Sequence, residues 1–203
     1  MKPCPEGTST PEINYPLKGV IVVRQGSRGG AYVKEMDLDA VVSQVGNALK
    51  MTNVSFPHLA AARASIEREI LRELVPSKVT PEYCDRLDRN VDEAETHFLA
   101  KDNHSRLRTN FGFHTLLAEL TENPIIILMH KVIVDLSISF FENVEATPAM
   151  VKKTLEHHRK IASYLRKGEL ESAAEICFEH IEKVSATIVE KSKKQSLLVS
   201  RRT

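Results

Sequence analysis

The spacing of apolar positions changes once along the chain, near Lys34. Before this point, the stretch GVIVVRQGSRGGAYV at residues 19–33 combines two short alternating runs with a glycine-containing turn at 24–30, a pattern typical of a β-hairpin. After it, apolar residues recur about every three and a half positions, which is the period of an amphipathic helix. We therefore expect a helical protein that carries one short hairpin near its N-terminus.

Seven helices are predicted, and most of them begin at a residue type that caps helices. Their expected starts are Asp37, Ser55, Thr80, about Lys101, Asn123, Thr147 and Glu169. The segment 124–141 is rich in β-branched residues, as strands are, but its length and its Asn-Pro start favour a helix buried on most sides. Because short loops join the helices, the predicted fold is all-α, an antiparallel bundle of six to seven helices.

Four parts of the chain are predicted from these patterns. Residues 1–18 carry four prolines and form a disordered arm, because such a composition buries too little surface to offset the entropy of ordering. Residues 19–34 form the hairpin, and residues 36–192 form the helical domain. The basic segment 193–203 is expected to be a flexible tail.

Composition narrows the function classes. The chain has 203 residues, 42% of them hydrophobic, and a net charge of +1, so no global charge favours nucleic acid or an anionic membrane. Three scattered cysteines suit reduced thiols in a cytoplasm. We expect no signal peptide and no run long enough to span a bilayer, and therefore a cytoplasmic protein without a membrane partner.

Three predicted helices each place a histidine where the helical period calls for an apolar residue. These are His114, His158 and His180, and Asn110 lies one turn before His114 on the same face. The neighbouring His157 falls about 100° away from its helix's apolar stripe and is expected to face solvent.

Two interpretations of these histidines stay open at the level of sequence. A buried neutral imidazole needs hydrogen-bond partners for both ring nitrogens, and satisfied core histidines are common. A divalent metal would remove the cost of burying three of them, with the amide oxygen of Asn110 as a further ligand. Imidazole suits zinc, nickel, copper or iron, and zinc and nickel are the expected ions.

Three segments of the chain resemble the FCD effector domain of GntR-type bacterial transcription regulators of the FadR-like subgroup. They are ARASIERE, NFGFHTLLAELTENP and EHHRKIASYLRKGELESAAEICFEH, and the resemblance covers about residues 36–190. Many members bind a divalent metal through an aspartate, a histidine four residues later, and two further histidines. By that match, the metal ligands here are Asn110, His114, His158 and His180.

The resemblance also implies a small carboxylate effector. Asn110 stands where the family usually has aspartate, so four neutral ligands would leave the ion its full double charge and favour an anion. Arg63 matches an arginine that faces the cavity in similar domains, where its guanidinium would clamp a carboxylate. The alternative is an exposed Arg63 paired with Glu67 one turn later.

The hairpin resembles the wing of a winged helix-turn-helix. Such a domain needs about fifty residues of helical pattern to place a recognition helix, and the residues before the hairpin do not show it. Arg24 and Arg28 can touch phosphate only weakly, because two charges release few counterions. We therefore expect a homodimeric ligand sensor that does not bind operator DNA specifically as this chain alone.

Two other functions are weighed against the sensor. A hydrolase with a three-histidine metal site would need a general base, and the nearest candidates, Glu67 and Glu156, are both expected to face solvent. No HExxH, nucleophile elbow or phosphate loop occurs, so an enzyme is not expected. A metal-free helical interaction module, with its histidines hydrogen-bonded in the core, is the third possibility.

Overall fold

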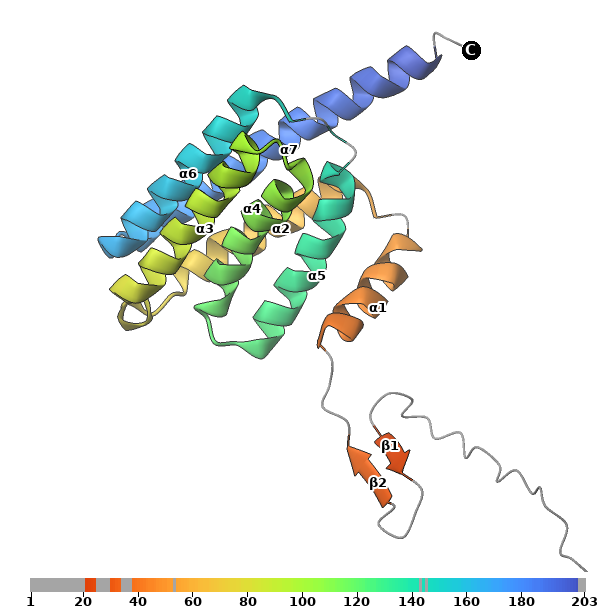
Figure 1. The fold of residues 1–203 in the computed structure, drawn as a ribbon, viewed down its shortest axis with the longest axis vertical. Helices are drawn as coiled ribbons and strands as arrows, with labels where there is room; N and C mark the ends of the chain where they lie inside the picture. The colour runs from red at the N-terminus through yellow and green to blue at the C-terminus, as the bar shows by residue number, and fades with distance from the viewer. Residues whose placement is uncertain are drawn as a thin grey trace, which may run out of the picture. The chain divides into compact units, whose positions relative to one another are not determined.

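A computed structural model describes residues 21–24, 30–33, 38–52, 54–142, 144 and 146–200. The chain forms two compact units, Met1–Leu38 and Asp39–Thr203. The described part of the first unit is an antiparallel hairpin of β1 (Ile21–Arg24) and β2 (Gly30–Val33), in which Val22 pairs with Tyr32. The second unit is helical throughout (Figure 1).

The seven described α-helices confirm the predicted all-α class. They are α1 (Leu38–Lys50), α2 (Phe56–Arg72), α3 (Pro81–Leu99), α4 (Asn103–Glu119), α5 (Pro124–Phe141), α6 (Pro148–Arg166) and α7 (Leu170–Ser200), with a short 3₁₀ turn η1 (Pro76–Lys78) after α2. α7 continues past residue 192, where the helical domain was expected to end.

Local sequence explains where these helices start and stop. Ser55, Thr80, Asn123 and Thr147 each accept a hydrogen bond from a backbone N–H of the first turn, and a proline follows within two residues. α6 ends at Arg166, and Gly168 follows two residues later with a φ of +74°, a backbone conformation that glycine adopts at little cost. These short-range signals are sufficient to set the boundaries that position the site.

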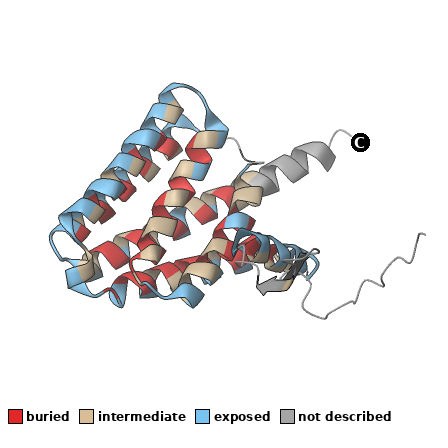
Figure 2. Cartoon of the chain, turned by 60° about the horizontal axis from the view of Figure 1, so that its bottom comes forward, coloured by how far each residue is buried: buried red, intermediate tan, exposed pale blue. Residues whose placement is uncertain are grey.

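Six of the helices form a closed ring around the core. In order of packing they are α2, α7, α6, α3, α4 and α5, with α5 returning to α2, and α2 also touches α4. The helix surfaces that face one another carry the buried residues, while exposed residues lie on the outer sides (Figure 2). This arrangement brings α4, α6 and α7 to a common interior from positions far apart in the sequence.

The described helices contain three apolar clusters of buried residues. The smallest joins Leu107 and Phe111 of α4 to Val134 of α5, and the other two are larger. The largest joins α2, α3, α4, α6 and α7 around side chains such as Leu71, Leu87 and Ile161, each fully buried. In the second largest cluster, Val42 of α1 packs with Leu59 of α2 and Val132, Ile133 and Leu136 of α5. Burying a large apolar side chain contributes about 1.5–3 kcal/mol, so these clusters supply much of the stability of the unit.

The apolar helix α5 differs from one sequence expectation. Among the described helices it is the one that is long and apolar enough to cross a membrane, with a mean hydropathy of 1.8 over 18 residues. Of this window, 33% is buried in protein: His130 lies beside Glu67, and Val132 and Leu136 pack with residues of α1 and α2. Core helices pass the same test, so α5 is weak grounds for a membrane role.

Several predictions fall outside the described residues. The arm at 1–18, the turn residue Arg28 and the last residues 201–203 are among them. Arg24 ends β1, but its side chain is not described. The roles of the hairpin as a wing and of its arginines as phosphate contacts stay predictions.

Candidate metal centre and adjoining cavity

Three histidines from three helices meet inside the ring. His114 of α4, His158 of α6 and His180 of α7 are all buried, and each offers a ring nitrogen within 4.8 Å of those of the other two. The Nε2 atoms of His114 and His158 are 3.1 Å apart. Side chains separated by 22 to 66 positions in the sequence therefore present nitrogen atoms to one small volume, as a metal site requires.

The ring of His114 is held in a defined orientation. Its Nδ1 is hydrogen-bonded to the carboxylate of Glu67 on α2. A protonated Nδ1 that donates to a carboxylate leaves Nε2 with a free lone pair, and this carboxylate–histidine pairing is the usual support of a metal-binding imidazole. His158 is fixed differently, by stacking on Phe113 with ring centroids 4.2 Å apart.

His157 corrects a sequence prediction. It was expected to face solvent, yet it is only 4% exposed, and its Nδ1 lies 3.4 Å from Nδ1 of His180. This contact occupies Nδ1 of His180 and leaves Nε2 as the nitrogen available to a metal. The prediction failed because α6 is buried on a wider arc than one stripe: Leu155 and Ile161 face the core, while His157 and His158 line the cavity.

The position of Glu67 also differs from the sequence prediction. It was expected to face solvent and is 1% exposed, and it is the most connected polar side chain of the site. Its carboxylate contacts His114, the guanidinium of Arg63 at 2.7 Å and Nε2 of His130 at 3.2 Å, and the thiol of Cys177 donates to it at 3.5 Å. The hydrogen bonds of one buried carboxylate thus connect α2 to α4, α5 and α7.

The pKa values of these groups follow from burial and charge. Burial raises the pKa of Glu67, but Arg63 and the histidines outweigh it and hold that pKa well below its usual range, so the acid is ionised. Burial lowers the pKa of His114 to about 4 despite Glu67, and it lowers the pKa of His158 and His180 well below 6.5. The imidazoles are therefore neutral near pH 7, the form that binds metals.

Asn110 lies in the same interior. It is 7% exposed, lines the cavity beside His114, and its Oδ1 is buried without a hydrogen-bond partner among the described residues. A buried amide oxygen left unpaired costs about 1–3 kcal/mol. Three neutral imidazoles and an unpaired amide oxygen fit a borderline divalent ion such as zinc or nickel, so the residues present are suited to the implied metal.

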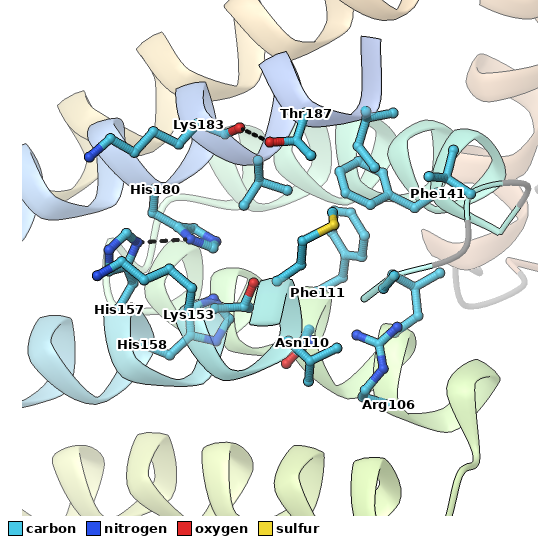
Figure 3. A pocket seen from close by; sticks show the side chains of 18 of the residues that line it. Arg106, Asn110, Phe111, Phe141, Lys153, His157, His158, His180, Lys183 and Thr187 are labelled. Atoms are coloured by element: carbon cyan, nitrogen blue, oxygen red, sulfur yellow. Dashed lines mark hydrogen bonds between the residues drawn. The ribbon is translucent and has the colours of Figure 1, made fainter. Parts of the chain in front are cut away.

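A cavity of about 330 Å³ adjoins the histidines (Figure 3). Its walls are largely apolar and include Leu107, Phe111, Phe141, Val184 and Ile188, and its polar lining includes Asn110 and the histidines. This combination of an apolar body and a few convergent polar groups is typical of a small-molecule site.

Arg63 combines the two alternatives weighed from the sequence. It lines the cavity and it pairs with Glu67, but it is buried at 5% exposure rather than exposed. Its guanidinium also lies over the ring of Phe111, 4.6 Å from the centroid. Arg63 thus has its geometry set by two partners while one side remains open to the cavity.

Neither carboxylate considered as a general base is placed to act as one. Glu67 is occupied by its four partners, and Glu156 lies on the exposed side of α6, paired with Lys153 and Lys160. A base must reach the proton it removes, and Glu156 is not among the residues that line the cavity.

Comparisons with known proteins agree with this architecture. The FCD domain family matches residues 58–183, more than half of the chain. Among curated relatives, the transcriptional repressor NanR of Cronobacter sakazakii is 28% identical over 182 residues, and NanR of Klebsiella aerogenes is 26% identical over 193. These matches cover 84% and 88% of this chain but only 65% and 70% of the two repressors, so the chain spans about two thirds of their length.

Solved structures share the fold. A GntR protein of Streptococcus agalactiae superposes with a TM-score of 0.61 at 24% identity, covering 83% of this chain and 75% of that one. A putative GntR regulator from Rhodococcus gives 0.59 at 16% identity, covering 84% and 73%. These structural similarities show a shared fold, and the family match identifies the chain as a member of the FCD domain family.

Proposed function

We propose that the helical unit is the ligand-sensing domain of a transcription regulator, and that it binds a divalent metal and a small carboxylate effector. The observation that carries this proposal is the convergence of the ring nitrogens of His114, His158 and His180 beside an otherwise apolar cavity. The family match and the repressor names of the relatives support a regulator rather than an enzyme.

The ligand set we assign is Asn110, His114, His158 and His180, with zinc or nickel as the ion. The bound ion would supply positive charge and a coordination position for a carboxylate oxygen. Glu67 orients His114, and His157 orients His180, through the hydrogen bonds described above. Because all four ligands are neutral, the site keeps a net positive charge and selects an anion.

Arg63 would bind the carboxylate of the effector. Its Nε donates a hydrogen bond to Glu67 at 2.7 Å. The other N–H groups of the guanidinium form no hydrogen bond with the described residues and can therefore donate to a ligand. A guanidinium that is already oriented loses little entropy when it takes an anion.

Regulation would follow from the position of the ligands on three helices. His114, His158 and His180 belong to α4, α6 and α7, so any ligand that prefers one spacing of these helices shifts their equilibrium packing. In a complete regulator this shift would alter how DNA-binding parts are held.

Zinc binding tests the proposal directly. Protein purified without a polyhistidine tag and stripped with chelator should take up about one equivalent of zinc in calorimetry. Zinc at a hundredfold excess over its Kd should stabilise the fold by about 2.7 kcal/mol, because binding free energy adds to folding free energy. His180→Ala should lose both effects, while His104→Ala, at an exposed histidine, should keep them.

Absence of zinc uptake by the wild-type protein would favour the metal-free interaction module instead. The role of Asn110 is tested by Asn110→Asp, which should strengthen zinc binding at least about tenfold, because a carboxylate is a stronger ligand than an amide. Unchanged zinc affinity in this variant would remove Asn110 from the ligand set.

We also propose a cytoplasmic homodimer. Ile125 and Met129, one turn apart on α5, are 66% and 44% exposed and form an apolar strip suited to a partner surface. Analytical ultracentrifugation should show a dimer that Ile125→Glu weakens. The expectation that this chain alone lacks specific operator binding stays a prediction, which a mobility-shift assay at moderate salt tests.

A further inference from the structure

The cavity contains a buried cation for which the described part of the chain offers no acidic partner. Arg106 of α4 is 7% exposed, it lines the cavity, and its Nε is buried without a hydrogen-bond acceptor. Among the described residues, no carboxylate forms an ion pair with it, and burial alone lowers its pKa. An arginine remains charged under these conditions, so this buried charge is uncompensated by any described residue.

The other cations that line the cavity are all compensated. Arg63 pairs with Glu67, Lys153 with Glu156, and Lys183 with Glu179. Arg106 therefore differs from every described cation around it. Keeping an unpaired guanidinium buried lowers stability, and such a group is commonly retained because a ligand supplies the missing acceptor.

The position of Arg106 relative to the metal centre is set by α4. Arg106, Asn110 and His114 are spaced four residues apart, so they lie in one row with about 12 Å along the helix axis between the first and the last Cα atoms. In Figure 3, Arg106 and Phe141 lie at the end of the cavity away from His157, His158 and His180, with Asn110 and Phe111 between. The lining between the two ends is largely apolar.

We propose that Arg106 is a second anion subsite and that the effector is a dicarboxylate, with one carboxylate at the histidines and the other at Arg106. This inference rests on the proposed function, because the first carboxylate occupies the metal centre. It specifies how long the effector must be and gives the effector a second negative charge. The planar guanidinium takes the far carboxylate through two parallel hydrogen bonds, and the apolar walls accept the carbon chain between the two ends.

A matched ligand series tests the inference. Zinc-loaded full-length chain is titrated by calorimetry with straight-chain dicarboxylates from succinate to suberate and with monocarboxylates of equal carbon number. At its best length, the dicarboxylate should bind at least about tenfold more tightly than its monocarboxylate counterpart, since a charge-assisted hydrogen bond is gained.

Two variants assign this preference to Arg106. Arg106→Met should abolish the difference between the two acid classes and leave zinc and monocarboxylate binding unchanged. Arg108→Met is the matched control on the same helix, because Arg108 is exposed, does not line the cavity and donates a hydrogen bond to His104. The ligand-free Arg106→Met protein should melt no lower than the wild type, whereas a purely structural role would lower its Tm.

The outcomes separate the two proposals. Monocarboxylate binding without any dicarboxylate preference, or a preference that survives in Arg106→Met, would overturn the second subsite and leave the proposed function standing. If zinc or every acid fails to bind the wild-type protein, the proposed function fails, and the dicarboxylate inference fails with it.

Discussion

The same helices enclose two interiors of opposite character, an apolar core and a polar region around the histidines and the cavity. α6 contributes Leu155, Ile161 and Leu165 to the apolar core, and His157 and His158 to the cavity. The core is stabilised by contact alone and needs no particular protonation state. The histidine cluster depends on Glu67, on neutral imidazoles and on what occupies the cavity. The difference shows how one bundle can combine an apolar scaffold with a polar region that, under the proposed function, would gain stability when a ligand binds.

The largest effect on stability is expected when the polar interior loses the carboxylate of Glu67. Glu67→Gln removes the charge that compensates Arg63 and the acceptor that orients His114, and should lower the free energy of unfolding by about 3–5 kcal/mol. Zinc affinity should fall about 10–100-fold, because an oriented metal-ligating histidine loses its carboxylate support. Denaturant unfolding and zinc calorimetry measure the two effects.

Glu69→Gln serves as the control for this prediction. Glu69 lies on the same helix, is about half exposed and pairs with Arg72, so its loss should change both quantities little. A Glu67→Gln protein with normal stability and normal zinc affinity would contradict the role assigned to this buried acid.

A comparable loss of stability in the apolar interior should leave zinc binding intact. Leu87→Ala, at a fully buried site in the largest cluster, should lower the free energy of unfolding by about 2–5 kcal/mol through lost transfer energy and a residual cavity. Zinc affinity of the folded variant should be unchanged. A weakened zinc site in Leu87→Ala would show that the two interiors are energetically coupled rather than separate.

Acid should destabilise the metal-free protein through the histidine cluster. Burial depresses the folded-state pKa of His114 to about 4, so between pH 6.5 and 4 the unfolded chain binds protons that the folded chain does not. Stability is therefore complete above pH 6.5 and falls as the pH is lowered, with His114 alone contributing about 2 kcal/mol between pH 7 and pH 5.

Urea unfolding of chelator-treated protein across this pH range measures the slope. The Leu87→Ala variant should show a parallel curve, displaced downward, because its core defect does not titrate. A flat wild-type profile between pH 7 and pH 5 would mean that the buried imidazoles are protonated as readily in the folded as in the unfolded state.

The helix boundaries and the three histidines of the site were predictable because their signals are local. Thr80, Asn123 and Thr147 cap helices through atoms two or three residues away, so a short stretch of sequence contains both partners. His114, His158 and His180 interrupt apolar stripes on single helices, and that pattern is visible without knowing which helices are neighbours.

Glu67, His157 and the unpaired Arg106 were decided by tertiary structure. α2 touches α4, α5 and α7, so it is buried on more than one face, and the partners of Glu67 on two of these helices stand 47 and 110 residues away in the sequence. A single helix does not show how many others will surround it. Whether a charged side chain meets solvent, an ion pair or an empty cavity depends on those neighbours, because the cost of burying a charge is set by the groups around it in space.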